Sequence, residues 1–432
     1  MFQRANLLHI ESPAGVGFSF AVDNNITTSD HQTAEDNYQA LVDFFHQFPE
    51  YQKRDLYITG ESYGGVYIPM LARLIAERLK DFPAKLKGLA IGNGILNDRD
   101  QQNSVIQLMY YRGLIGNDKW RQINQECCND ASQTCDYFKH LQFNQTAKEW
   151  QSDGTLCGDL AYEVSSFDVA HTANDQYNTY QDCYRGESGQ VTFDGQQRIA
   201  GYGLPKLVDV DKGVPDTARL FNYDSTDAHL GYACYQDDVV KDYLNWGKVK
   251  DALHVHQHVW DREWTPCNED LNQNLYHRTQ FDQQKDLEKV LLAIPDVQIL
   301  IYNGDTDSVC NFLGDSWFAE RLAKATGMKK TADRASWLYR KQIAGYAEKY
   351  TKDKATLQVV TVKGAGHFVP LDRAGPSLQM LQNFMNNKTL STPLSGVKLQ
   401  PLNHGAPTRP LNHIYVLLCL FTQAIIVKKT VV

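Results

Sequence analysis

Short runs of apolar and β-branched residues recur along the chain, and each ends in glycine, asparagine or proline. They cover residues 6–10, 55–59, 86–91, 297–302 and 356–362. Near-continuous apolar runs separated by helical stretches are typical of parallel strands that helices cover on both faces. Helices are expected over residues 36–48 and 66–79, where the apolar positions of the second stretch repeat at helical spacing. The pattern therefore predicts an α/β fold with a mostly parallel sheet.

The same pattern divides the chain into four parts. Strands and helices alternate over residues 1–97 and again over 290–388, which we expect to be two parts of one core. Residues 98–289 lack this alternation and hold seven of the nine cysteines, so they are expected to form a disulfide-tied cap with core helices at its edges. The pattern dissolves over residues 389–432. The apolar run 414–427 is shorter than the ~20 residues of a membrane-spanning helix, which favours an unstructured tail over a membrane anchor.

Composition and charge narrow the class of protein. The chain has 432 residues, 42% of them hydrophobic and 22% charged, which is ordinary usage for a large globular protein. A net charge of −8 without a basic stripe argues against a nucleic-acid partner. Nine cysteines and the sequons at Asn25, Asn144 and Asn387 indicate an oxidising, secretory compartment. Residues 1–6, by contrast, hold neither the apolar region nor the cleavage site of a signal peptide.

A candidate nucleophile lies in the segment Gly60-Glu61-Ser62-Tyr63-Gly64, which matches the pattern G-x-S-x-G of a nucleophile elbow. An expected strand precedes this segment and an amphipathic helix follows it. A sharp strand-to-helix turn would expose the hydroxyl of Ser62, and glycines are expected on both sides because a Cβ there would clash. The helix would direct its N-terminus at the reacting centre.

A nucleophilic serine needs a base, and the base needs a carboxylate that orients it. In α/β-hydrolases the chain order is serine, acid, histidine, each after its own strand. His367 is the only one of 13 histidines in a glycine-flanked turn after a late strand, and we expect it to be the base. The strand before it in the chain leads into Asp305 and Asp307. We favour Asp307 as the acid because it lies further around the turn, and we expect Asp305 to hold that turn.

Three other features have simpler explanations than chemistry. His254, His256 and His258 suggest a metal site, but no carboxylate or cysteine completes a ligand set, so no metal and no cofactor are expected. Cys310 is expected to be a thiol near the site, where the serine makes a cysteine nucleophile unnecessary. Glu11 is expected to shape its own loop rather than to act as an acid.

Several segments together make the chain resemble the serine carboxypeptidase family. They are residues 6–20, 60–65 (Gly-Glu-Ser-Tyr-Gly-Gly), 91–94 (Ile-Gly-Asn-Gly), 303–312 (Asn-Gly-Asp-Thr-Asp-Ser-Val-Cys-Asn-Phe) and 364–370 (Gly-Ala-Gly-His-Phe-Val-Pro). The resemblance implies an α/β-hydrolase fold and an enzyme that removes C-terminal amino acids from peptides with a free C-terminus. It implies that Ser62 is the nucleophile, Asp307 the acid and His367 the base, and that the backbone N–H of Tyr63 is an oxyanion donor.

The resemblance also gives Glu61 a role in binding the substrate carboxylate. The family uses a pair of glutamates that share a proton at acidic pH, because a carboxylic acid donates a hydrogen bond where a carboxylate would repel. Burial and a like-charged neighbour raise a carboxyl pKa, so activity at acidic pH is implied. The partner glutamate and the family segment N-G-G-P-G-C, which supplies a second oxyanion donor, would precede Asn6. The chain is therefore expected to be N-terminally truncated and impaired as an enzyme.

By the same resemblance, disulfides would join Cys127 to Cys157, Cys128 to Cys135 and Cys183 to Cys234. Cys267 would pair with the cysteine of N-G-G-P-G-C, so it is expected to stay a thiol here. The implied location is the lysosome or the secretory route, and whether the protein forms a homodimer is left open.

Two other functions remain open at this point. An acyltransferase would use the same three residues and pass the acyl group to an alcohol. The resemblance also allows a non-catalytic scaffold that binds and stabilises partner glycosidases. The complete set of serine, acid and base favours an enzyme.

Overall fold

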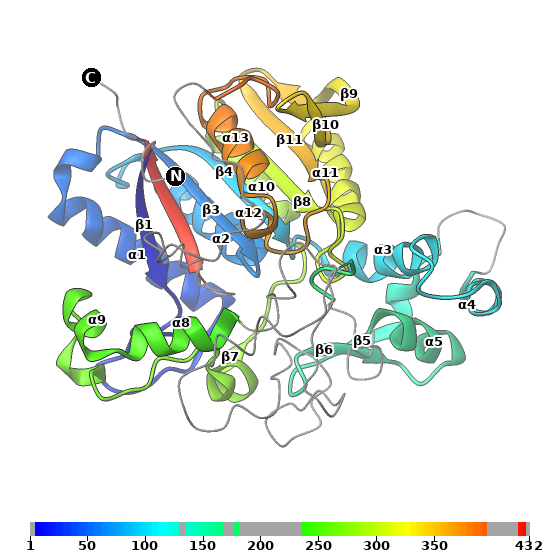
Figure 1. Ribbon diagram of the computed structural model, residues 1–432, viewed down its shortest axis with the longest axis horizontal. Helices are drawn as coiled ribbons and strands as arrows, with labels where there is room; N and C mark the ends of the chain where they lie inside the picture. The colour runs from blue at the N-terminus through cyan, green and yellow to red at the C-terminus, as the bar shows by residue number, and fades with distance from the viewer. Residues whose placement is uncertain (1–4, 129–134, 167–175, 181–235, 395–421, 429–432) are drawn as a thin grey trace, which may run out of the picture.

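A sheet of eight strands forms the centre of the structure. A computed structural model of the chain describes residues 5–128, 135–166, 176–180, 236–394 and 422–428 (Figure 1). The strands of the sheet are β1 (Ala5–Glu11), β3 (Asp55–Ser62), β4 (Lys85–Gly94), β8 (Gln298–Gly304), β9 (Lys329–Tyr339), β10 (Gln342–Lys352), β11 (Ala355–Val362) and β12 (Thr422–Lys428). They lie in the order β1–β12–β3–β4–β8–β11–β10–β9.

The middle of this sheet is parallel. β3, β4, β8 and β11 are neighbours, and the fully buried residues Ile58, Leu89, Ile299 and Leu357 align in one row across them. β12 and β10 run antiparallel to both of their neighbours, so six of the eight strands point the same way. β1, β3, β4, β8 and β11 are the five apolar runs of the sequence. The predicted α/β fold with a mostly parallel sheet is therefore confirmed.

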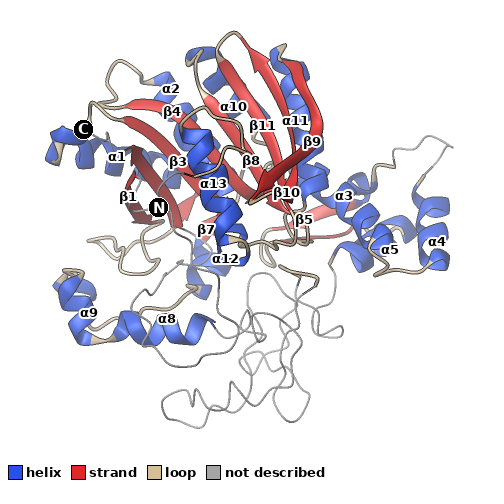
Figure 2. Cartoon of the chain, turned by 45° about the horizontal axis from the view of Figure 1, so that its top comes forward, coloured by secondary structure: helices blue, strands red, loops and turns tan. Residues whose placement is uncertain are grey.

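Helices cover both faces of the sheet. The helices are α1 (Asp30–Gln47), α2 (Gly64–Glu77), α3 (Asp98–Tyr111), α4 (Asn117–Cys127), α5 (Leu156–Ser165), α8 (Gln236–Asn245), α9 (Gly247–Ala252), α10 (Gln284–Ala293), α11 (Phe312–Thr326), α12 (Val369–Asp372) and α13 (Ala374–Met385). α1, α2, α10 and α11 pack on one face, and α13 packs on the other (Figure 2). Along β8, Ile299 and Ile301 face the first group while Leu300 faces α13. Each such burial is worth about 1.5–3 kcal/mol, which explains why consecutive residues of β8, Ile299 to Ile301, are all apolar.

Three strands of the sheet were not predicted from the sequence. β9 and β10 form an antiparallel hairpin at one edge, and nearly all of β9 is exposed, so it lacks the apolar signal of the central strands. β12 comes from the tail that we expected to be unstructured, and that expectation is wrong for residues 422–428. They pair antiparallel with both β1 and β3 (Figure 1). The Ile- and Val-rich run suits a strand as well as it suits a helix.

The region predicted as a cap contains helices and a small hairpin. α3, α4 and α5 share their own apolar cluster, and α4 is tied by the disulfides Cys127–Cys157 and Cys128–Cys135. The hairpin consists of β5 (Leu141–Asn144) and β6 (Glu149–Ser152). α3 packs on α11, and α10 packs on α2, so core helices lie at the edges of this region.

Other predictions for the cap and the tail are not decided by the described residues. The predicted bond between Cys183 and Cys234 lies outside the described residues. The domain boundaries at 97, 289 and 388 stay predictions. Within the described residues, no helix is both long enough and apolar enough to span a bilayer.

Candidate active site

Ser62 lies at the carboxyl end of β3, directly before α2, in a backbone conformation that few residues adopt. Its φ is +58°, in the left-handed region, and Ser62 is almost fully buried. A strained, positive φ at a buried serine is the conformation expected of a nucleophile elbow. The carbonyl of Ser62 accepts a hydrogen bond of 3.0 Å from the N–H of Ile95, which fixes the elbow against the end of β4.

The glycine that this elbow requires is Gly65 rather than Gly64. A Cβ on Gly65 would meet the backbone of Ile95 and Gly94 at 2.4–2.9 Å, whereas a Cβ on Gly64 would have only Ile68 nearby, at 3.7 Å. The expectation of a clash at Gly64 is therefore wrong. The close contact lies one residue later, where α2 crosses the end of β4.

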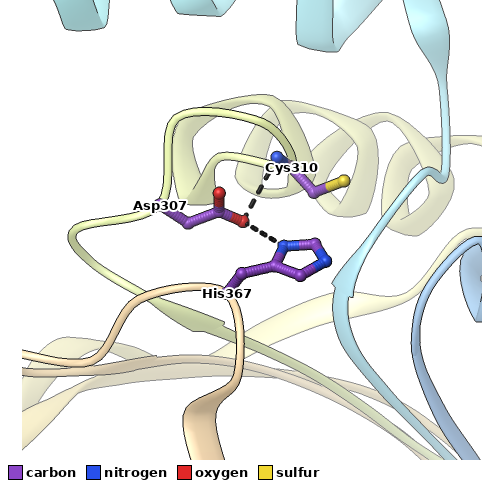
Figure 3. A group of neighbouring side chains, drawn as sticks. All are labelled: Asp307, Cys310 and His367. Carbon is purple, nitrogen blue, oxygen red and sulfur yellow. Dashed lines mark hydrogen bonds and ion pairs between the residues drawn. The ribbon is translucent and has the colours of Figure 1, made fainter. Parts of the chain in front are cut away.

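Asp307 and His367 form a buried hydrogen-bonded pair. Nδ1 of His367 lies 2.7 Å from Oδ2 of Asp307, and neither side chain is exposed (Figure 3). Because an ionised carboxylate only accepts, Nδ1 carries the proton and Nε2 carries the lone pair. The same carboxylate accepts further hydrogen bonds from the backbone N–H groups of Val309, at 2.8 Å, and Cys310, at 3.2 Å. Asp307 is thus held in one orientation and fixes the tautomer of His367.

Two glycines allow the turns that carry this pair to touch. A Cβ on Gly304, at the end of β8, would overlap the carbonyl oxygens of Gly366 and Ala365. A Cβ on Gly366 would lie 2.3 Å from the carbonyl oxygen of Tyr177. Because Gly304 has no side chain, the segment after β11 can lie directly on the end of β8, and because Gly366 has none, Tyr177 can lie directly on that same segment. This approach brings Asp307 and His367, which are 60 positions apart in the chain, into contact.

Asn93 is a member of this site to which sequence reasoning assigned no role. Its Nδ2 donates to Oδ2 of Asp307 at 2.8 Å, and its Oδ1 accepts from the N–H of Gly304 at 2.9 Å. Its own φ is +37°, and its side chain is fully buried. The segment Ile91-Gly92-Asn93-Gly94 was recognised as a motif, but a single sequence does not show that the amide reaches across to the turn after β8.

Tyr177 is a second such residue. Its carbonyl accepts a hydrogen bond of 2.7 Å from the N–H of His367, and its ring lies 4.8 Å from the imidazole. Its neighbour Gln176 accepts from the N–H of Ser308 at 3.1 Å. Residues 176–180 therefore join both catalytic turns, although they belong to the predicted cap.

Asp305 holds the turn, as we expected. Its Oδ1 accepts a hydrogen bond of 2.7 Å from the N–H of Gly364, and its carboxylate thereby links the two glycine-containing turns. The structure gives it no contact with the imidazole, whereas Asp307 has one. The geometry therefore favours Asp307 as the acid.

Cys310 lies beside the pair and completes a group of three donor atoms within 4.8 Å of one another (Figure 3). Burial and the neighbouring Asp307 raise the pKa of the Cys310 thiol well above its usual range, so the sulfur is a neutral thiol rather than a thiolate. A metal site needs the thiolate, and the Asp307 carboxylate already accepts four hydrogen bonds, from His367, Asn93 and the backbone N–H groups of Val309 and Cys310. This group does not fit a metal ion.

Glu61 precedes the nucleophile and lies in a row that crosses three strands. Glu61 pairs with Gly92 on β4, and Gly92 pairs with Tyr302 on β8. A Cβ on Gly92 would overlap the ring of Tyr302, so the glycine leaves room for this ring to lie across β4. The phenol of Tyr302 then forms a hydrogen bond with the carboxyl group of Glu61.

This environment favours the protonated form of Glu61. Burial, which is the largest cause, and the negative charges of Asp372 and Asp307 together raise the pKa of Glu61 to about 8, against the opposing effects of His367 and Tyr302. A carboxyl group with this pKa fits the neutral acid that the family resemblance implies, and the role of Glu61 in binding the substrate carboxylate stays a prediction.

Two pockets adjoin the site, one beside Tyr63, which follows Ser62, and one beside Ser308, which follows Asp307. A pocket of about 580 Å³, partly open to solvent, is lined by Tyr63, Tyr67 and Tyr276 together with Leu271. A second pocket, of about 1000 Å³, borders Ser308 beside Asp307. Lys148 and Arg278 line both pockets, so the two spaces are neighbours.

The remaining sequence candidates have structural roles. Glu11 accepts from the N–H of Phe18 at 2.7 Å and from Nε1 of Trp264 at 2.9 Å, so it shapes its loop as expected. His256 and His258 stack on Phe20.

The three sequon asparagines differ in exposure. Asn25 and Asn387 are exposed, and Asn144 is half-buried. Cys267 lies outside both disulfides.

The strained serine, the buried Asp–His pair and the parallel sheet covered by helices define a hydrolase of the α/β type. The family model described as serine carboxypeptidase matches residues 2–387. The chain therefore belongs to the serine carboxypeptidase family.

Named relatives agree with this membership. The chain is 34% identical over 409 residues to serine carboxypeptidase ctsa-3.2 of Caenorhabditis elegans, covering 90% of this chain and 77% of the relative. It is 34% identical over 390 residues to lysosomal protective protein of Mus musculus, covering 89% and 75%. The fold is similar to the crystal structure of a prohormone-processing carboxypeptidase from Saccharomyces cerevisiae, with a TM-score of 0.57 and 20% identity, covering 87% of this chain and 73% of that one.

Proposed function

We propose that this protein is a serine-type carboxypeptidase that releases C-terminal amino acids from peptides through an acyl-enzyme. The observation that carries the proposal is the fully buried hydrogen bond of 2.7 Å between Asp307 and His367, at the sheet edge where Ser62 sits with a φ of +58°. Membership of the family supports the same reaction.

The reaction would proceed in two balanced halves. Nε2 of His367 takes the proton of the Ser62 hydroxyl as Oγ attacks the carbonyl carbon of the last peptide bond. Negative charge develops on the carbonyl oxygen, and the N–H of Tyr63, at the start of α2, donates to it. The imidazolium then protonates the leaving amine, which departs as the C-terminal amino acid. Water, deprotonated by His367, then attacks the ester carbon of the acyl-enzyme. The bond to Oγ breaks, the shortened peptide leaves with a new C-terminal carboxylate, and the imidazolium returns its proton to Ser62.

Glu61 would give the enzyme its preference for a free C-terminus. With a pKa of about 8, its carboxyl group is neutral at and below physiological pH and is able to donate a hydrogen bond to the substrate carboxylate. Ionised Glu61 would repel that carboxylate instead. An ester or an amidated peptide has no such charge and would not depend on this proton.

The test is amino-acid release from blocked dipeptides by the wild-type protein, the Ser62→Ala variant and the Asp305→Asn variant. We expect release by the wild type, a loss of at least about 10⁴-fold in Ser62→Ala, and a far smaller loss in Asp305→Asn. Substantial release by Ser62→Ala would reject the nucleophile. Transfer of the acyl group to an added alcohol in preference to water would favour the acyltransferase. Absence of both reactions in a protein that includes any segment upstream of Met1 would favour the scaffold.

We propose a lysosomal or secreted location for this protein. Two disulfides, the exposed sequons at Asn25 and Asn387, and the printed name of the mouse relative support a lysosomal or secreted protein. Peptides with a free C-terminus are the proposed substrates. Association with glycosidases stays a prediction from the resemblance, to which the word "protective" in that name lends support.

A further inference from the structure

A buried carboxylate contacts the side chain of Tyr63, whose backbone N–H is the proposed oxyanion donor. The mechanism above does not use this carboxylate. Asp30 is the first residue of α1, and its side chain is fully buried. An acid in the first turn of a helix commonly interacts with the helix dipole. Here the N-terminus is capped by Ser29, whose hydroxyl accepts from the N–H of Gln32. The carboxylate of Asp30 instead faces away from its own helix.

Both oxygens of Asp30 are used by other segments. Oδ1 accepts hydrogen bonds of 2.6 Å from the phenols of Tyr63 and Tyr276. Oδ2 accepts from the N–H of Thr279 at 2.5 Å and from the N–H of Gln280 at 2.8 Å. Hydrogen bonds to a carboxylate are roughly twice as strong as those between neutral groups. Asp30 therefore ties the residue after the nucleophile to a loop more than 200 positions away.

The backbone prepares this arrangement. β2 (Thr28–Ser29), directly before Asp30, pairs in parallel with β7 (Tyr276–His277). This pairing brings Tyr276 and the loop after it to the start of α1. Tyr63 is the residue that caps α2, and its phenol reaches the same carboxylate from the other side.

The phenol of Tyr63 is enclosed as well as bonded. Its ring packs edge-on against Tyr67 at 5.0 Å and against Tyr276 at 5.9 Å. The Arg278 guanidinium lies 5.6 Å from the centre of the ring. Burial raises the pKa of the Tyr63 phenol well above its usual range, which keeps it a donor at every working pH. A side chain fixed at its far end also limits how far its own backbone N–H is able to move.

We infer that Asp30 is a positioning residue for catalysis, which holds the N–H of Tyr63 in line with the developing oxyanion through the Asp30–Tyr63 hydrogen bond. This inference rests on the proposed function, because it assigns the oxyanion to that N–H. A displacement of about 1 Å in a catalytic group is able to cost 10²-fold in rate, and loss of an oxyanion donor costs about 10²–10³. The effect should fall on kcat, since the donor acts on the transition state.

The chain offers a matched control. Tyr276 donates to the same oxygen of Asp30 at the same distance, lines the same pocket, and is equally buried, but it does not adjoin the nucleophile. Tyr63→Phe and Tyr276→Phe each remove one hydroxyl from the same carboxylate. A structural role for the hydrogen-bond cluster predicts equal effects of the two variants, whereas the positioning role predicts unequal effects.

The experiment measures kcat and KM on a blocked dipeptide for both phenylalanine variants, for Asp30→Asn and for Asp30→Asn combined with Tyr63→Phe. We expect Tyr63→Phe to lower kcat by about 10- to 100-fold with KM changed less than about 3-fold, and Tyr276→Phe, which alters the pocket but does not adjoin Ser62, to lower kcat far less, whatever its effect on KM. Asp30→Asn should lower kcat, and adding it to Tyr63→Phe should cost less than about 3-fold more.

Equal kcat values for the two phenylalanine variants would overturn the inference, as would independent, multiplying losses in the double variant. Should Asp30→Asn fail to fold, the comparison of Tyr63→Phe with Tyr276→Phe decides alone. Hydrogen exchange of the backbone over residues 62–65 gives a readout that needs no turnover. Faster exchange in Tyr63→Phe than in Tyr276→Phe supports the inference even if peptide release fails, and equal exchange rejects it.

Discussion

Replacing Glu61 by Gln should separate the pH dependence of substrate binding from that of the catalytic triad. The amide is of similar size and donates a hydrogen bond at every pH, whereas the acid donates only while it is protonated. With a pKa of about 8, Glu61 is about nine-tenths neutral at pH 7 and about one-tenth neutral at pH 9. For a peptide with a free C-terminus, kcat/KM of the wild type should therefore fall about tenfold per pH unit above pH 8.

The assay is the pH profile of kcat/KM from pH 4 to 10 on a blocked dipeptide and on its C-terminal amide. The wild type should lose activity at alkaline pH on the dipeptide with a free C-terminus but not on its amide. Glu61→Gln should show no such alkaline loss on either substrate. Activity at low pH should fall in every variant, because a protonated His367 cannot accept the proton of Ser62. An alkaline limb near pH 8 that survives in Glu61→Gln would assign it to another group and would remove Glu61 from substrate binding.

Tyr302 provides a second, opposite perturbation of the same group. Its phenol favours the ionised form of Glu61, so Tyr302→Phe should raise the pKa of Glu61 and move the alkaline limb to higher pH. A shift of the limb to lower pH would contradict the row of contacts from Glu61 across Gly92 to Tyr302.

The same carboxyl group should also leave a signature in stability. Raising its pKa from 4.5 to about 8 is worth about 5 kcal/mol at most, and this is a cost that the folded state bears only when Glu61 is ionised. Between these pH values the folded state holds a proton that the unfolded state has released. The unfolding free energy of the wild type should therefore fall as pH rises from 5 to 9, relative to Glu61→Gln. Urea unfolding at both pH values measures this, and a constant difference would contradict the raised pKa.

Two further predictions concern single contacts. Asp307→Asn should lower kcat by about 10⁴-fold, because the amide disturbs the tautomer of the imidazole, and Asp305→Asn should cost far less; the reverse ranking in steady-state kinetics would move the acid to Asp305. Gly65→Ala should lower the unfolding free energy by about 1–3 kcal/mol, because its Cβ would meet backbone atoms at 2.4–2.9 Å, while Gly64→Ala should be neutral or stabilising in urea unfolding. Equal effects of the two alanines would contradict the packing of the elbow.

The sequence was sufficient for the parts of the fold that depend on local pattern. The central strands are buried on both faces, so their apolar runs are visible in the sequence without knowledge of their neighbours. The edge hairpin β9–β10 has mostly exposed positions and therefore carries no such signal. β12 could not be predicted because its pairing with β1 and β3 joins positions about 360–420 residues apart, which no local pattern records.

The candidate site divides in the same way. Ser62, Asp307 and His367 each follow a strand in a glycine-containing turn, so their positions were readable one at a time. Asn93 and Tyr177 act through contacts made across the fold. Asn93 lies in a recognised segment, but no local sequence pattern shows which distant residue either side chain or carbonyl contacts. Asp30 was not identified because an acid at a helix start is common, and only its burial and its partners distinguish it.

The most direct test of the account is to map the residue that an active-site serine probe modifies. A fluorophosphonate should label the wild-type protein on Ser62, located by mass spectrometry of its peptide, and labelling should be lost in His367→Ala, which retains the serine but lacks the base. Labelling of a different residue, or labelling of Ser62 at an unchanged rate in His367→Ala, would contradict the assignment of the nucleophile and its base.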